Sequence, residues 1–75
     1  MKDLVEFIAR SLVDDPAAVR VDEEWHGDRV ILRLAVAESD KGKVIGKQGR
    51  IANAIRTMLK IAATRDGARA SLDID

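Results

Sequence analysis

Two glycines separated by two residues stand between an apolar pair and a long helical pattern. The segment from residue 44 to residue 51 reads Val-Ile-Gly-Lys-Gln-Gly-Arg-Ile. Because glycine has no Cβ, Gly46 and Gly49 allow another backbone to approach closely. Gly49 also precedes the expected start of a helix, where unpaired N–H groups and the helix dipole favour a phosphate. The segment therefore predicts a turn suited to a nucleic-acid backbone, with Lys47 and Gln48 at its tip.

A purely structural role for the same segment is equally compatible with these residues alone. Gly46 would then end one helix and Gly49 would start the next, as in an ordinary helix–turn–helix connection. The sequence of the turn does not decide between the two roles, so its surroundings must.

Charge is distributed unevenly along a chain whose formal net charge is zero. From residue 41 to residue 65 there are seven basic residues and no acidic one. From residue 1 to residue 28 there are eight acidic residues and three basic ones. Because the cationic part contains both glycines, the charge pattern favours a polyanionic partner over a purely structural turn.

The size and composition of the chain limit the remaining choices. A chain of 75 residues without cysteine is expected to form one domain, residues 1–75, held by packing or by a partner. No stretch approaches the about 20 apolar residues of a membrane span, and no signal peptide is visible, so we expect a cytoplasmic protein with no membrane contact. Phe7 and Trp25 are the only aromatic residues, which argues against recognition by stacking bases on rings.

Hydrophobic periodicity predicts a definite order of elements. We expect a helix over 3–13, strands over 19–25 and 29–36, a short helix capped by Ser39 or Asp40 and ending at Ile45, a long helix from Gly49 to about Arg65, and a strand over 68–74. The first two strands should pair as an antiparallel hairpin across the turn at His26-Gly27-Asp28. One-sided strands and amphipathic helices predict an α+β fold, in which helices cover one face of a three-stranded sheet. The other face should stay in water, with the arginines Arg20, Arg29, Arg33 and Arg69.

The expected helices carry apolar stripes that should face the sheet. The stripe of the first helix is formed by Leu4, Ile8 and Leu12, with Val5 and Phe7 beside them, and that of the long helix by Ile51, Ile55, Met58, Leu59 and Ala62. Ile61 lies off the second stripe and shares a shoulder with Ala54, next to Met58. This shoulder is a candidate dimer contact, unless the first helix or the third strand covers it.

No set of residues points to catalysis or to a metal. His26 is the only histidine and lies in the expected hairpin turn, so it has no second histidine or cysteine with which to share a metal. The acid pairs at 14–15 and 23–24 are interpreted as solvated charges, because neighbours on a strand point apart. No nucleophile–base pair or phosphate loop of the Gly-x-x-x-x-Gly-Lys type is present. We therefore expect no enzyme, no cofactor and no small-molecule substrate.

The order of elements and the run Gly46-Lys47-Gln48-Gly49-Arg50 resemble a type II KH domain. The similarity is greatest to the small bacterial KhpA family and continues through residues 51–59, Ile-Ala-Asn-Ala-Ile-Arg-Thr-Met-Leu. The resemblance implies that the GXXG loop clamps the backbone of about four single-stranded nucleotides.

The resemblance assigns roles to individual residues around this loop. Gly46, Lys47, Gln48 and Gly49 would contact phosphates, and Lys43 and Arg50 would border the turn. Ile45 would help to floor a groove for the bases, with apolar residues of the second strand behind it. Ala52 stands where many KH domains have a branched aliphatic residue, so weakly selective binding is expected.

Two functions follow from these expectations. The first is a non-enzymatic protein that binds single-stranded RNA with low sequence selectivity, as an RNA chaperone or cofactor in bacterial RNA metabolism. The second is a dimerisation or protein-interaction adaptor in which RNA binding is incidental. The family resemblance also implies self-association, or pairing with a larger RNA-binding partner that has its own KH domain.

Overall fold

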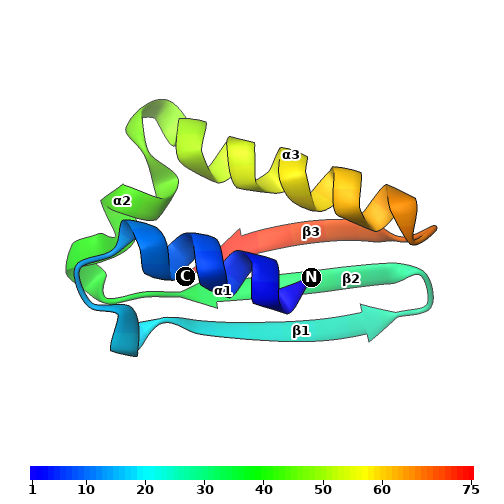
Figure 1. Ribbon diagram of the computed structural model, residues 1–75, viewed down its shortest axis with the longest axis horizontal. Helices are drawn as coiled ribbons and strands as arrows, with labels where there is room; N and C mark the ends of the chain where they lie inside the picture. Colours follow the sequence, from blue (N-terminus) through cyan, green and yellow to red (C-terminus); the bar gives the residue numbers. More distant parts are fainter.

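The computed structural model describes residues 1–75 as a three-stranded sheet with its helices on one face (Figure 1). The elements follow in the order α1 (Lys2–Leu12), β1 (Arg20–His26), β2 (Arg29–Ala35), α2 (Lys41–Ile45), α3 (Arg50–Arg65) and β3 (Arg69–Ile74). Short 3-10 turns at Pro16–Ala18, Glu38–Asp40 and Lys47–Gly49 lead into β1, α2 and α3. The α+β class and the order of elements are confirmed, with boundaries shifted by one or two residues.

The central position of β2 makes its apolar face the most deeply buried part of the sheet. Val30, Leu32 and Leu34 are each 0% exposed. β1 pairs with one side of β2 as the expected antiparallel hairpin, and β3 pairs with the other side in parallel. A parallel pair needs a long crossover, which α2 and α3 supply. β1 and β3 are therefore the two edge strands.

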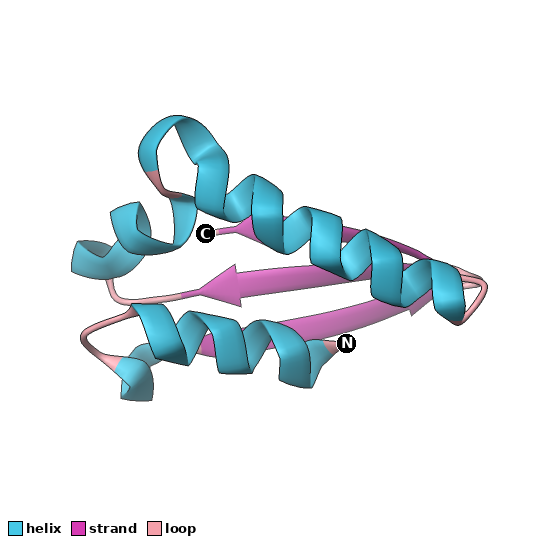
Figure 2. Cartoon of the chain, turned by 45° about the horizontal axis from the view of Figure 1, so that its top comes forward, coloured by secondary structure: helices cyan, strands magenta, loops and turns pink.

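α1 and α3 lie on the same face of the sheet and run in opposite directions (Figures 1 and 2). The buried residues of α1 are Val5 and Ala9, whereas Leu12 is exposed and Phe7 is 72% exposed. The predicted stripe was therefore wrong about Leu12, and Phe7, which was expected beside the stripe, is exposed. The buried side of α1 is centred on Val5 and Ala9, and at 100° per residue Phe7 lies on the opposite side of the helix.

The core face of α3 is rotated in the same way. Ala52 and Ala63 are buried beside Ile55 and Leu59, while Met58 is 42% exposed. The prediction that Met58 belongs to the core stripe was wrong, because the buried stripe follows Ala52, Ile55, Leu59 and Ala63 and leaves Met58 at its border. Neither α3 nor any other helix is long and apolar enough to cross a membrane.

Near the hairpin turn, the helix-covered face of β1 carries polar contacts instead of apolar packing. Glu23 Oε2 accepts a hydrogen bond from the backbone N–H of Lys2 at 3.1 Å, and Glu23 Oε1 accepts one from Trp25 Nε1 at 3.0 Å. Glu23 thus satisfies an N–H group at the start of α1, which has no cap of its own. Trp25 lies beyond the end of α1 and remains about half exposed.

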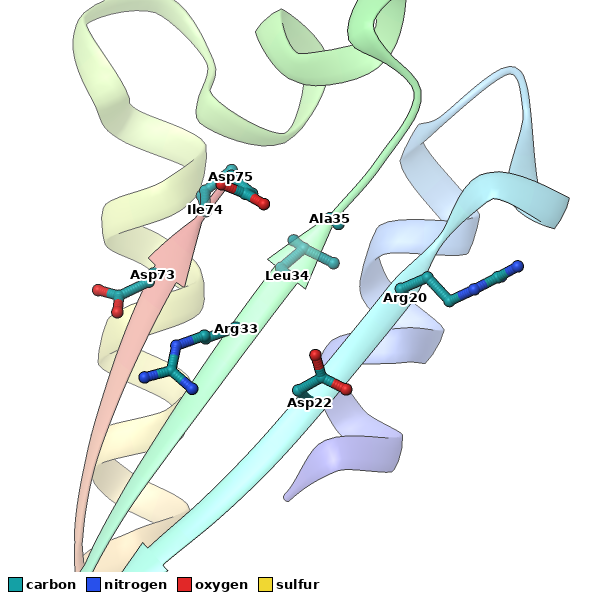
Figure 3. Close-up of a pocket in the computed structure, with 8 residues that line it drawn as sticks. All are labelled: Arg20, Asp22, Arg33, Leu34, Ala35, Asp73, Ile74 and Asp75. Carbon is teal, nitrogen blue, oxygen red and sulfur yellow. The ribbon is translucent and has the colours of Figure 1, made fainter.

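The face of the sheet opposite the helices carries charges of both signs (Figure 3). Arg33 of β2 lies in register between Asp22 of β1 and Asp73 of β3, and its guanidinium donates to Glu24 Oε2 at 3.0 Å. This contact, together with His26, holds the pKa of Glu24 below its usual range. A hollow of about 240 Å³ at one end of this face has acidic and basic residues in its lining. Its mixed charge gives a nucleic acid little attraction to this face.

Candidate nucleic-acid interface

The turn between α2 and α3 stands away from the sheet (Figures 1 and 2). Three of its residues have positive φ: Gly46 at +77°, Gln48 at +58° and Gly49 at +75°. The N–H of Gly46 donates to the carbonyl of Gly42 at 2.9 Å, and the N–H of Gly49 donates to the carbonyl of Gly46 at 3.1 Å. The turn, called the elbow below (residues 46–49), is thus held by its own backbone hydrogen bonds.

The two glycines of the elbow are needed for different reasons. A Cβ at Gly46 would lie 2.6 Å from Ile51 Cγ1 and 2.9 Å from the Ile51 backbone nitrogen, so no side chain fits there. A Cβ at Gly49 would meet only Asn53 Nδ2, at 3.9 Å. Gly46 is therefore required for space and conformation, whereas Gly49 is required for its left-handed conformation. The outer surface at Gly49 stays open to a ligand.

The polar side chains of the elbow face solvent and are not neutralised by the protein. Lys47, Gln48 and Arg50 are exposed. Neither Lys47 nor Arg50 forms an ion pair with any of the acidic residues. No side chain caps the N-terminus of α3, and the N–H of Arg50 donates to the carbonyl of Lys47. Ile45, the last residue of α2, is exposed directly beside the elbow.

A buried carboxylate fixes α2, and with it the elbow. Asp40 precedes α2 as predicted, but its side chain does not cap this helix. The side chain is 1% exposed and accepts hydrogen bonds from the backbone N–H groups of Asp14 and Asp15 at 3.2 and 3.1 Å. The prediction of an Asp40 side-chain cap was wrong, because burial beside the end of α1 offers the carboxylate two fixed donors.

Lys43 completes this cluster instead of projecting freely beside the elbow. Its ammonium group forms an ion pair with Asp14 and lies 3.5 Å from Asp40 Oδ1. The contact with Asp14 raises the pKa of Lys43. The sequence-based interpretation of Asp14 as a solvated charge was therefore wrong, because its carboxylate pairs with Lys43. A phosphate would have to compete with two carboxylates for Lys43, and its role in binding stays a prediction.

A groove of about 520 Å³ lies between α3 and the free edge of β3. Its lining consists of Arg56, Lys60, Ala63, Thr64, Ala68, Arg69, Ala70, Ser71 and Leu72. Three of these nine residues are cationic and none is acidic. On α3 the groove follows the polar side that begins with Asn53, one turn after the elbow. The polar side of α3 therefore leads from the elbow to a groove whose lining contains no carboxylate.

This groove differs in two respects from the one expected from the sequence. Its strand is β3, because the apolar residues of β2 are completely buried and can only lie in the core beneath. Ala52 is 2% exposed and packs on the core side of α3, so it does not face the groove. The weakly selective binding expected from Ala52 therefore has no support at this position.

Several groove residues were absent from the predicted site. Arg56 and Lys60 were counted only among the seven basic residues of 41–65, Arg69 was expected on the open face of the sheet, and Ser71 was given no role. Arg56 and Lys60 share one side of α3 because they are four residues apart, and the sequence contained this signal. The position of Arg69 depends on which edge of β2 receives the third strand, which the sequence did not reveal.

The opposite side of α3 presents the apolar shoulder formed by Ala54, Met58 and Ile61. Met58 and Ile61 are 42% and 55% exposed, so neither the first helix nor the third strand covers them. α1 lies beside α3 on this side of the molecule, and its Phe7 is also exposed (Figure 1). α3 therefore has three surfaces: a core face, a cationic side toward β3 and an apolar side toward α1.

An exposed Gly-x-x-Gly elbow between two helices, on a three-stranded sheet with the order α-β-β-α-α-β, defines a KH domain of type II. A family model described as "KhpA/KhpB, KH domain" matches residues 2–74, and the chain belongs to this family. The RNA-binding protein KhpA of Clostridium perfringens is 53% identical over 74 residues, which cover 99% of each chain. The proteins of the same name from Clostridium acetobutylicum and Chlamydia pneumoniae are 54% and 45% identical and are covered to 99% and 95%.

A solved structure shares the fold at much lower sequence similarity. It is the crystal structure of Era in complex with MgGDPNP and nucleotides 1506–1542 of 16S ribosomal RNA. The alignment has a TM-score of 0.58 and 19% identity, and it covers 97% of this chain and 28% of Era. At this level of identity the similarity supports the fold alone.

Proposed function

We propose that residues 1–75 act as one KH module that binds single-stranded RNA along the elbow and the groove between α3 and β3. The observation that carries this proposal is the lack of carboxylates both in residues 41–65, which run from Lys41 through the elbow and α3, and in the lining of the groove. The relatives in Clostridium and Chlamydia, all named RNA-binding protein KhpA, support the same conclusion.

The elbow would hold the sugar–phosphate backbone, because its backbone is bare at Gly49 and its cations are unpaired. Lys47 and Arg50 would neutralise phosphates through charge-assisted contacts. Gln48 would add a hydrogen bond at the tip. The strand would then continue along α3, whose 16 residues span about 24 Å, enough for about four nucleotides.

The proposed role is a non-catalytic one in cytoplasmic RNA metabolism, as an RNA chaperone or cofactor. Contacts to phosphate carry no sequence information, so binding that depends mainly on the elbow is weakly selective. A protein that holds many RNAs in single-stranded form needs this combination of charge and low selectivity.

Replacing Lys47 and Gln48 by Asp tests the proposal. The double variant places two carboxylates at the tip of the elbow, where they would repel phosphate. Both side chains are exposed, so the free energy of unfolding should change little. We expect binding of fluorescein-labelled single-stranded RNA, measured by fluorescence anisotropy, to be abolished.

A matched control separates the local effect from the change in net charge. Lys2→Asp combined with Ala17→Asp changes the net charge by the same amount at exposed positions far from the groove. The control should bind RNA nearly as the unmodified protein does. Equal loss in the two double variants, or wild-type affinity of the elbow variant, would contradict the proposal.

Self-association is a second proposed property, and the apolar side of α3 is the observation that favours it. The shoulder of Ala54, Met58 and Ile61 lies away from the groove, so a partner there would leave the RNA surface free. The partner would be a second copy of the chain or a larger protein with its own KH domain. A protein-interaction adaptor that binds RNA only incidentally would use the same shoulder.

A further inference from the structure

We propose that Arg56 reads a base in the groove between α3 and β3 and favours guanine over adenine at that position. This inference rests on the proposed function, since it concerns the RNA that the groove would hold. It adds a modest preference at one nucleotide to binding that is otherwise weakly selective.

The Arg56 side chain crosses the groove from α3 to the edge of β3. Its Nε and Nη2 donate to the backbone carbonyl of Leu72 at 3.3 and 3.2 Å, and its Nη1 donates to Asn53 Oδ1 at 3.3 Å. The guanidinium is thus fixed on two sides, by a strand and by its own helix. A group held in this way loses little further freedom when it binds a ligand.

The same contacts leave part of the guanidinium free for a ligand. A guanidinium carries five N–H donors, and the three contacts with Leu72 and Asn53 use three of them. One N–H remains on each of Nη1 and Nη2. Two donors on neighbouring nitrogens match two neighbouring acceptors, as O6 and N7 of guanine provide.

Arg56 also removes an acceptor from the edge of the groove. The carbonyl of Leu72 points away from β2 and would otherwise accept a hydrogen bond from a base amino group. With Arg56 bound to it, this position offers N–H donors and a positive charge. Adenine presents an amino donor beside N7, so at this position one of its two groups would face another donor.

The charged side chains in the rest of the groove do not oppose this preference. The other polar side chains that line it are Lys60, Thr64, Arg69 and Ser71, and no carboxylate is available to accept from an amino group. Lys60 and Arg69 can neutralise the flanking phosphates. Arg56 is the groove side chain that is both cationic and fixed by hydrogen bonds within the chain.

The test compares short uridine RNAs that differ only at one central position, which is guanine, adenine, cytosine or uracil. Anisotropy titrations of the unmodified protein should show at least about 5-fold tighter binding of the guanine RNA than of the adenine RNA. Arg56→Ala should reduce this ratio to within about 2-fold, because it removes the donors and uncovers the Leu72 carbonyl.

Arg56→Lys is the second variant, and it keeps the positive charge at this position. A lysine retains the positive charge, so binding of the all-uridine RNA should stay within about 3-fold of the unmodified protein. The guanine preference should still be lost, because an ammonium group does not offer a planar pair of donors. Urea unfolding of each variant shows whether it is folded, and Arg56→Lys decides the outcome should Arg56→Ala fail to fold.

The outcomes distinguish this inference from the proposed function. Equal binding of the four RNAs by the unmodified protein, or a guanine preference that survives in Arg56→Lys, would overturn the role of Arg56 and leave RNA binding intact. Failure of the unmodified protein to bind any of the four RNAs would overturn both.

Discussion

At the scale of single residues, the elbow depends on Gly46 for space and on both glycines for conformation. Gly46→Ala places a Cβ 2.6 Å from Ile51 Cγ1, so either the elbow or the start of α3 must move. Gly49→Ala meets no such contact, and it should cost only the about 1–2 kcal/mol of a left-handed alanine. We expect Gly46→Ala to lower the free energy of unfolding by more than Gly49→Ala does. Urea unfolding of the two variants provides the comparison. Equal decreases in the free energy of unfolding would show that the Ile51 side chain moves aside at little cost.

The buried carboxylate of Asp40 should make the stability of the protein sensitive to acid. The hydrogen bond from the Asp14 backbone is the main cause that lowers the pKa of Asp40, with further help from Asp15 and Lys43, although burial acts in the opposite direction. A carboxyl with a lowered pKa contributes its full stability above its unfolded value of about 3.9. That contribution is lost as the pH falls through the lower, folded value.

Asp40→Asn tests this coupling. We expect a lower urea midpoint at neutral pH and a weaker dependence of the midpoint on pH below about 5 than in the unmodified protein. Circular dichroism at several pH values measures both. Asp28→Asn is the control, because Asp28 is exposed and its side chain forms no ion pair. If the urea midpoint of Asp40→Asn depended on pH as that of Asp28→Asn does, the contacts of Asp40 with Asp14, Asp15 and Lys43 would not be important for stability.

The sequence predicted which residues form the elbow. It did not predict the contacts that Asp40 and Lys43, which precede the elbow, make with Asp14. Gly46, Lys47 and Gly49 follow from local chemistry, because φ and exposure in a turn depend on adjacent residues. Asp40 and Lys43 contact Asp14, which lies more than 20 residues away in the chain. Such contacts follow only from the packing of α1 beside α2, and no local pattern encodes them.

At the scale of elements, α3 connects binding and assembly because its three sides have different chemistry. The apolar side should mediate self-association through Met58 and Ile61. Ile61→Asp would place a charge in such an interface without disturbing the core, since Ile61 is 55% exposed. We expect sedimentation to show a lower mass for this variant, with RNA binding per chain retained.

Lys60→Asp is the matched substitution on the opposite side of α3. It should leave the sedimentation behaviour unchanged and weaken RNA binding, because Lys60 lines the groove. A mass for Ile61→Asp that equals that of the unmodified protein, with the fold intact, would remove the proposed dimer contact. The two variants together test whether the sides of α3 act independently.

The predicted helices and strands were confirmed, but the buried face of each helix was less well predicted. The period of apolar residues shows that α1 and α3 each have an apolar side. It does not show which residues of that side are buried, and it led us to place the large Met58 in the core and Phe7 beside it. The structure buries Ala9, Ala52 and Ala63, because small residues let a helix approach the sheet. Periodicity also gives no information on whether β3 joins β2 or β1, and this choice creates the groove.

At the scale of the whole molecule, a net charge of zero conceals a separation of charge that should control RNA binding. The acidic residues lie mainly in the first part of the chain and on the open face of the sheet, whereas the elbow and the groove are cationic. For about three or four phosphate contacts, the logarithm of the binding constant should fall with the logarithm of salt concentration with a slope of about −2 to −3. Anisotropy titrations over a range of salt concentrations measure this slope, and a value near zero would contradict binding through phosphates.

The location of the bound strand is the central claim, and an NMR titration of the ¹⁵N-labelled protein with a short single-stranded RNA tests it most directly. We expect the amide signals of Lys47, Gln48 and Gly49 to shift together with those of Arg56 and Leu72, which line the groove. The signals of the open sheet face should stay in place. Shifts confined to that face, around Arg33 and Asp73, or no shifts at all, would contradict binding along the elbow and the groove.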